Sequence, residues 1–292
     1  MSTTAFTQEQ VSSRSRSLPS FPRIVTEILA TLDDPDGHFD VLVRAINRDP
    51  LISARVLSVA NTAALRGTRE AEVCDINTAT SLIGMNRVRH ITMISSMSTF
   101  VAGAARNGLP PSFWQHSVAA GVCCEELALH IAAPVPSAMA LITGLLHDIG
   151  QLWLYHVDAA AVQVCWREAT ARAIGIEAVE REHFGLDHST IGAWLAQHWG
   201  LPAPVVVAIG GHHQPESAMC SPLVSLMHVA EVLSNALDLA GRQENRVTYL
   251  SALACKNLGL VWAEDIKPLF GQIEARSRHM NAFFSMPHPL NL

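Results

Sequence analysis

The side chains best suited to chemistry are imidazoles and carboxylates that recur through the second half of the chain. The sequence contains 14 histidines, among which a His-Asp doublet and a His-His doublet stand out. Neutral imidazole and carboxylate are natural ligands of divalent Fe, Mn, Zn and Mg ions. The candidate metal ligands are His116, His147, Asp148, His188, His212, His213 and Glu231.

A bundle of helices can bring such residues together, because inward-facing side chains from several helices meet at one site. A carboxylate there can bridge two ions, with a second set of imidazoles completing the second ion. We therefore expect one or two divalent ions, able to activate water for attack on a phosphate. A lone His-Asp or His-His doublet is more often a hydrogen-bonding or capping pair. The order of these residues along the chain, with the His147-Asp148 doublet about 30 residues after His116, favours the metal interpretation.

Helical periodicity dominates the sequence after residue 22, and strand signals are nearly absent. The pattern therefore predicts an all-α fold. The helices expected in the second half, where the ligands lie, are 113–131, 137–156, 159–173, 176–183, 189–199, 204–212, 223–240, 248–258 and 264–280.

Breaks in the pattern predict how the chain is divided. Residues 1–17 are polar and are expected to form a disordered tail, as are residues 286–292. The Asn-Gly-Leu-Pro-Pro-Ser segment 107–112 is the clearest internal break. We expect one helical subdomain over 18–106 and a second over 107–285.

Composition narrows the class of protein. Hydrophobic residues make up 49% and charged residues 16%, which is typical of a globular chain. The formal net charge of −6 argues against broad nucleic-acid binding. No signal peptide or membrane-spanning segment is visible, and the six cysteines form no CxxC pair. These features predict a cytoplasmic protein with reduced thiols and no membrane partner.

Several motifs together resemble the HDOD (HD-related output domain) family, within the HD superfamily of metal-dependent phosphohydrolases. The likeness covers about residues 18–235. The motifs are Leu18-Pro-Ser-Phe-Pro22, Asp49-Pro50-Leu51, Ala60-Asn61-Thr62, Ile76–Gly84, Trp114-Gln-His116-Ser117, Gly144-Leu-Leu-His-Asp-Ile-Gly150, His188-Ser-Thr-Ile-Gly192, Trp199-Gly-Leu-Pro202 and His212-His213-Gln-Pro215.

The resemblance implies an N-terminal helical bundle packed against an HD-like bundle, and a role as an output module of bacterial signalling. In catalytic relatives, the positions of His116, His147 and Asp148 bind metal together with a late acidic residue. Glu231 stands where that family usually has Asp. The positions of the remaining three candidate histidines would serve a second metal.

Two departures count against catalysis. Gln151 follows the His-Asp-Ile-Gly motif, where catalytic phosphodiesterase relatives usually carry Lys to hold phosphate charge. Gln151 is therefore the candidate residue near phosphate. The Gly-Tyr-Pro signature of cyclic-di-GMP phosphodiesterases is missing after His213, so that activity is not predicted.

Three functions stay open at this point. The first is a non-catalytic signalling module that binds a protein partner and retains a vestigial pocket for an ion or a small ligand such as a nucleotide. The second is a metal-dependent phosphohydrolase acting on a nucleotide or phosphodiester. The third is nucleic-acid binding through the scattered arginines of the N-terminal half, which we read instead as a solvated helix surface.

Overall fold

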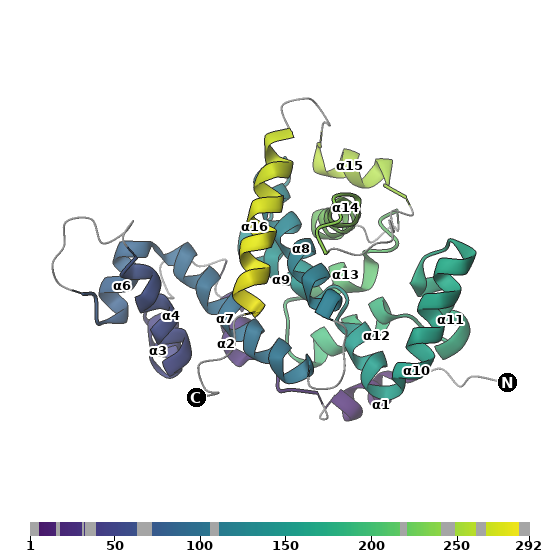
Figure 1. Ribbon diagram of the computed structural model, residues 1–292, viewed down its shortest axis with the longest axis horizontal. Helices are drawn as coiled ribbons and strands as arrows, with labels where there is room; N and C mark the ends of the chain where they lie inside the picture. Colours follow the sequence, from purple (N-terminus) through teal and green to yellow (C-terminus); the bar gives the residue numbers. More distant parts are fainter. Residues whose placement is uncertain are drawn as a thin grey trace. The chain divides into compact units, whose positions relative to one another are not determined.

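Helices make up all the regular structure that the computed structural model describes (Figure 1). The described residues are 6–15, 18–30, 32, 39–62, 72–105, 111–216, 221–240, 249–260 and 267–285. None of them forms a β-strand, so the all-α prediction is confirmed. The predicted tail 286–292 and residues 107–110 of the predicted break 107–112 lie outside the described residues, while Pro111 and Ser112 begin a helix. In the part of the chain that is described, no helix combines the length and apolar character needed to cross a bilayer.

The chain folds as two compact units, and each is built from its own set of helices. Residues 20–103 form the smaller unit, while residues 1–19 and 104–292 form the larger one. The helices of the smaller unit are α2 (Arg23–Ala30), α3 (Phe39–Asn47), α4 (Pro50–Ala60), α6 (Ile76–Ile83) and most of α7 (Met85–Ala105). Those of the larger unit are α1 (Gln8–Arg14), α8 (Pro111–Ala128), α9 (Ser137–Leu146), α10 (Ile149–Arg172), α11 (Ile176–Phe184), α12 (His188–His198), α13 (Ala203–Gly211), α14 (Pro222–Ala236), α15 (Ala252–Leu258) and α16 (Lys267–Ser285).

In the smaller unit, aspartate caps begin two of the helices. The Asp49 carboxylate accepts hydrogen bonds from the amides of Leu51 and Ile52 at the start of α4, and Pro50 suits the first helical position. Asp75 caps α6 in the same way. The Asn61 side chain bonds both backbone groups of Val73, which joins the end of α4 to the segment before α6.

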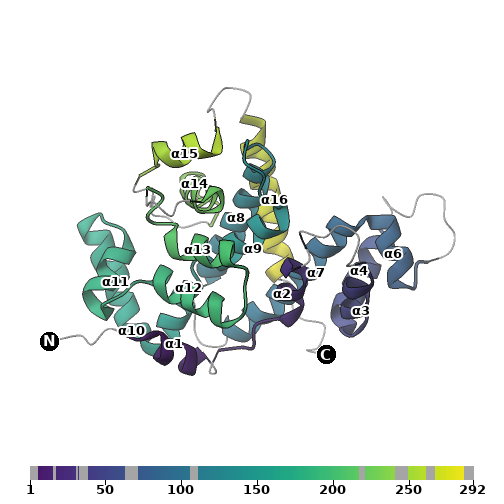
Figure 2. The ribbon, with the colours of Figure 1, turned by 180° about the vertical axis from the view of Figure 1, so that it is seen from behind.

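In the larger unit, α8 is central: it packs against α9, α14 and α16 (Figures 1 and 2). α12 packs against α10 and α13, and α15 lies on α14. The core is mostly aliphatic, but it also buries polar and ionisable side chains near one point. Those side chains include the predicted ligands.

The prediction of disorder over residues 1–17 is wrong for the residues that the structure describes there. Thr7 and Gln10 form a reciprocal capping box at the start of α1. Val11 is fully buried, and α1 packs against α12. The Phe6 ring also meets Trp153 edge-on at 5.0 Å. A single apolar residue in a polar segment gives no periodic signal, so tertiary contacts stabilise this helix rather than its own sequence pattern.

One continuous helix is predicted over 137–156, but the structure has two helices there, α9 and α10, with an interruption at His147 and Asp148. His147 Nδ1 donates to the carbonyl of Gly144 at 2.7 Å. A continuing helix would give that carbonyl to the amide of Asp148. The side-chain bond thus helps to end α9, and it leaves His147 and Asp148 at the junction of two helices. The later predicted break is present as a kink at Asp158, inside α10.

Candidate metal centre

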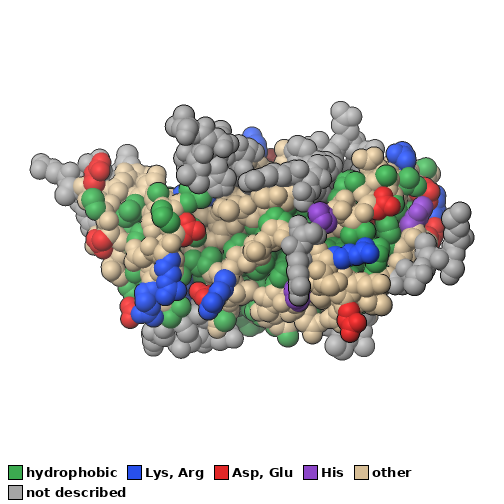
Figure 3. Space-filling view, turned by 90° about the horizontal axis from the view of Figure 1, so that it is seen from below, with side chains coloured by type: hydrophobic (Ala, Val, Ile, Leu, Met, Phe, Trp, Pro, Cys, Tyr) green, Lys and Arg blue, Asp and Glu red, His purple; other side chains and the backbone are tan. Residues whose placement is uncertain are grey.

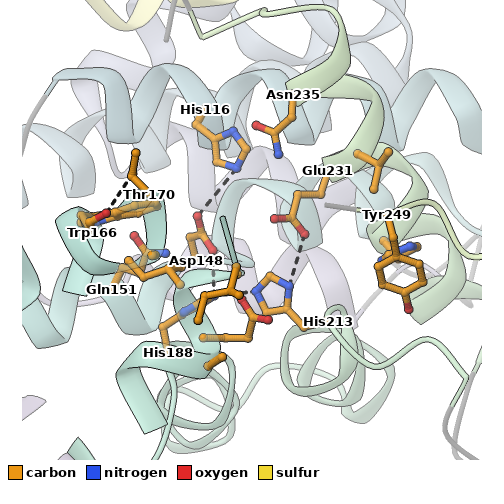
Figure 4. A pocket seen from close by; sticks show the side chains of 18 of the residues that line it. His116, Asp148, Gln151, Trp166, Thr170, His188, His213, Glu231, Asn235 and Tyr249 are labelled. Carbon is orange, nitrogen blue, oxygen red and sulfur yellow. Dashed lines mark hydrogen bonds and ion pairs between the residues drawn. The ribbon is translucent and has the colours of Figure 1, made fainter. Parts of the chain in front are cut away.

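All seven predicted ligands come from the larger unit, and the structure brings them together from different helices. His116 lies on α8, and His147-Asp148 joins α9 to α10. His188 begins α12, while His212 and His213 follow the end of α13. Glu231 lies on α14, and its side chain points toward His213 in Figure 4. That these residues hold a metal stays a prediction.

Close contacts between helix backbones place the first part of this cluster. A Cβ atom added at Gly144 would lie 2.5 Å from the Cα of Gly121, so α8 and α9 touch at these glycines. A Cβ at Gly150 would overlap the carbonyl oxygen of His188. The absence of side chains at these crossings lets His116 approach His147, and Asp148 approach His188.

The Asp148 carboxylate lies at the centre of the cluster and faces two ways. Its Oδ2 atom is 3.4 Å from His147 Nε2 and 3.7 Å from His116 Nε2. Its Oδ1 atom is 3.2 Å from His188 Nε2 and 4.0 Å from His212 Nε2. One oxygen thus faces each set of histidines, which is the arrangement of a carboxylate that bridges two ions.

The remaining candidate ligands form two groups near Asp148. We call His188, His212 and His213 the triple-histidine group, and His116, His147 and Glu231 the mixed group. Within each group, the nearest ligand atoms all lie within 4.8 Å of one another. Each group together with one Asp148 oxygen offers four donors, which suits a divalent ion.

Backbone hydrogen bonds orient two of the histidines toward the centre. His147 Nδ1 donates to Gly144, and His212 Nδ1 donates to the carbonyl of Ile209, each at 2.7 Å. Both rings therefore turn their Nε2 atom toward Asp148. His212 is fully buried, and its Nε2 atom has no hydrogen-bond partner among the described residues. A buried ring nitrogen without a hydrogen-bond partner is suited to coordinate an ion at the centre.

Comparison with known proteins identifies the family to which this helical architecture belongs. A family model described as the HDOD domain matches residues 18–215. The chain belongs to the HDOD domain family. The family is related to the HD phosphohydrolase superfamily, so the recognition made from sequence motifs is confirmed.

Solved structures share the fold of this HDOD protein over nearly its whole length. A protein of Shewanella amazonensis SB2B, provisionally named a phosphohydrolase, is 25% identical with a TM-score of 0.70, covering 94% of this chain and 98% of that one. An HDOD domain protein of Geobacter sulfurreducens is 19% identical with a TM-score of 0.68, covering 95% and 97% of the two chains. A protein of Marinobacter aquaeolei VT8, provisionally named for signal transduction, is 20% identical with a TM-score of 0.73, covering 96% and 61%.

Curated relatives match in sequence over part of their length. A Treponema pallidum (strain Nichols) protein without an assigned function is 24% identical over 237 residues, which is 78% of this chain and 44% of that protein. Ribonuclease Y of Pelobacter propionicus is 30% identical over 148 residues, which is 51% of this chain and 22% of the enzyme. The HDOD protein thus spans less than half the length of these curated relatives.

Charges around the centre set which groups carry protons. Burial alone would raise the pKa of the Asp148 carboxyl, but His147, His188 and His116 outweigh it and hold that pKa well below its usual range. Burial and the neighbouring histidines hold the pKa values of His212 and His213 well below the usual value. These two imidazoles are therefore neutral, as metal ligands must be.

Glu180 on α11 is a residue of this site that the sequence analysis missed. Its Oε2 atom accepts hydrogen bonds from His188 Nδ1 at 2.6 Å and from the His188 amide at 2.8 Å. Burial would lower the pKa of His188, but Glu180 and Asp148 outweigh it and raise that pKa well above its usual value. A fully buried carboxylate thus fixes the ring orientation of one candidate ligand, as outer residues of metal sites commonly do.

His228 lies close to the cluster but has a structural role. Its Nδ1 atom donates to the carbonyl of His212 at 3.0 Å, and its Nε2 atom accepts from the amide of Ser251 at 3.1 Å. Both ring nitrogens are thus engaged with backbone. His228 holds the His212 segment and the start of α15 against α14.

A cavity of about 630 Å³ opens beside the cluster. His116, Asp148, His188, His213 and Glu231 reach its wall, so part of both ligand groups is accessible from it (Figure 4). Gln151, the candidate residue near phosphate, also lines it. A molecule much larger than water can therefore approach both sides of the cluster.

Proposed function

We propose that this HDOD protein is a signal-transduction output protein whose larger unit binds two divalent metal ions around Asp148, and that the adjoining cavity takes a small ligand. The observation that carries the proposal is the placement of one Asp148 oxygen toward each of the two ligand groups. A buried carboxylate shared by two sets of imidazoles is difficult to explain by packing alone, because buried charges need compensation.

Binding without turnover is favoured by the wall of the cavity. Gln151 stands where catalytic phosphodiesterase relatives usually have Lys, and it is buried in the first turn of α10. The described residues that line the cavity include neither lysine nor arginine. The wall therefore offers no fixed positive side chain to neutralise charge that develops on a reacting phosphate.

The signalling role is proposed from the family together with the two-unit construction. In this proposal the smaller unit binds a signalling protein partner, and the larger unit reports metal and ligand occupancy. Among the described residues on the face seen in Figure 3, basic and acidic side chains are interspersed and form no continuous basic patch. That distribution gives no support to the nucleic-acid alternative.

Metal content tests the proposal directly. The protein is expressed in medium supplemented with Mn and Fe, purified without chelator and measured by elemental analysis alongside a chelator-treated sample. We expect close to two ions per chain in the first sample and a loss of thermal stability in the second. Less than about a tenth of an ion per chain in both would overturn the proposal.

A metal-dependent phosphohydrolase is the second candidate, favoured by the completeness of the ligand set. When bound, divalent ions would supply Lewis acidity toward a phosphate and lower the pKa of water. Seven side chains of the protein would then hold the ions, and substrate would reach the ions through the cavity. Turnover of bis(p-nitrophenyl) phosphate by the Mn-loaded protein, absent in an Asp148→Asn variant, decides between the candidates. Rates of the order of 1 per second would favour the enzyme.

A further inference from the structure

The cavity is much larger than the metal cluster needs, and the part of its wall beyond the candidate ligands is partly aromatic and has no basic side chain among the described residues. Beyond the ligands it is lined by the second half of α10, by the turn into α11, and by α14. A volume of about 630 Å³ is in the range of sites for small organic molecules. An ion and its solvent would leave most of this space to another group.

Two aromatic side chains mark the outer wall. In Figure 4, Trp166 lies on one side of the view and Tyr249 on the other, with Asp148 and Glu231 between them. Tyr249 is held in place, because its hydroxyl donates to Glu216 at 2.7 Å and its ring lies 5.1 Å from that of His228. Flat aromatic walls favour a flat, uncharged organic group through burial and stacking.

The charges of the wall limit what else the ligand carries. Asp148, Glu177 and Glu231 are the carboxylates that line the cavity, and neither lysine nor arginine is among its described lining residues. Two divalent ions carry four positive charges and would exceed the three negative charges of Asp148, Glu231 and the buried Glu180 behind His188. The small positive surplus suits one phosphate group better than several. A polyphosphate would need further cations, which proteins usually supply through Lys or Arg. Glu177 would instead repel it.

We propose that the cavity binds an organic monophosphate, with the phosphate at the metal cluster and an uncharged aromatic group against Trp166, and that it discriminates against polyphosphates. This inference rests on the proposed metal binding. It adds the class of ligand, and it assigns Trp166 to the aromatic group and Glu177 to the exclusion of extra phosphates.

Calorimetry on the Mn-loaded protein tests the proposal with four probes: inorganic phosphate, adenosine, adenosine monophosphate and adenosine triphosphate. Adenosine monophosphate should bind about tenfold more tightly than inorganic phosphate, the gain expected from stacking one base. Adenosine triphosphate should bind no more tightly than the monophosphate, and adenosine alone should bind weakly. Phosphorus NMR after each titration establishes that the probe is intact.

Two variants assign the effect to residues. Trp166→Ala should weaken adenosine monophosphate binding about tenfold and leave inorganic phosphate unchanged. Trp199→Ala is the matched control, because Trp199 is also half-buried in the larger unit but does not line the cavity. Glu177→Lys should raise the affinity for the triphosphate relative to the monophosphate, since it places a cation on the wall. This gain does not depend on the Trp166→Ala variant folding.

Metal analysis of the same samples separates the two ideas. A metal-loaded protein that binds inorganic phosphate and adenosine monophosphate equally would overturn this inference and leave the metal centre standing. A wild-type preference for the triphosphate would overturn it as well. A protein that takes up no metal and binds none of the probes would instead overturn the proposed function.

Discussion

The two ligand groups around Asp148 differ in chemistry and in support. The triple-histidine group offers imidazoles alone, and Glu180 holds one of them from behind through two hydrogen bonds. The mixed group includes a carboxylate, and its Glu231 side chain is 16% exposed. Imidazole suits Zn and Fe, whereas added carboxylate suits Mn and Mg. Asp148 thus lies between a nitrogen-rich group and an oxygen-richer group, and residues of both groups line the cavity.

Removal of the shared residue should have the largest effect. Asp148→Ala takes one donor from each group and leaves the surrounding buried imidazoles without their counter-charge. We expect both ions to be lost, from close to two per chain to near zero by elemental analysis. Glu274→Ala, which removes an exposed carboxylate on α16, should leave metal content unchanged. Retention of one full ion by the Asp148 variant would mean that the two halves are independent.

Removal of one ligand from each half should separate them. His212→Ala should lower metal content by about one ion and leave the mixed group loaded, while Glu231→Ala should do the reverse. His198→Ala, which changes an exposed histidine at the end of α12, is the control. The preference for one metal over another should change as well, because the Glu231 variant keeps mainly imidazole ligands and should retain Zn more readily than Mn. Loss of both ions from either variant would contradict the division into two groups.

A change at the crossing of α10 and α12 should disturb the packing that supports His188 and thus the triple-histidine group. Gly150→Ala places a methyl group against the His188 carbonyl, which forces the two backbones apart. We expect the free energy of unfolding to fall by about 2 kcal/mol, within the usual range for overpacking. Chemical denaturation of the metal-free protein measures this. Gly271→Ala on α16, where a Cβ meets nothing within 4 Å, should show no loss.

The smallest effect should come from the support behind His188. Glu180→Gln keeps the shape of the side chain but weakens its bonds to the His188 ring and amide. Metal affinity of the triple-histidine group should fall about tenfold, with the mixed group little changed. Competition with a chromophoric chelator resolves the two sites. Glu182→Gln, on the exposed side of the same helix, is the matched variant, and an equal loss there would remove the special role of Glu180.

The sequence identifies the candidate ligands that the structure brings together, but it does not identify the residues that support them. His116, the two doublets and Glu231 stand out because imidazoles and acids in that order are uncommon and match family motifs. Glu180 carries no such signal, since its position behind His188 depends on the turn at Gly185, whose φ is +75°. The break at His147 was also missed, because it depends on a side-chain bond rather than on a helix-breaking residue. The cavity walls depend on packing between α10, α11 and α14, which periodicity does not reveal.

The origin of the ligands has a consequence for folding. The donors come from α8, the α9–α10 junction, α12, the end of α13 and α14, which are far apart along the chain. Ions held there would act as non-covalent cross-links that close several long loops at once. Such cross-links reduce the entropy of the unfolded chain and stabilise only the fully assembled larger unit. Metal uptake would then report that this unit has completed its folding.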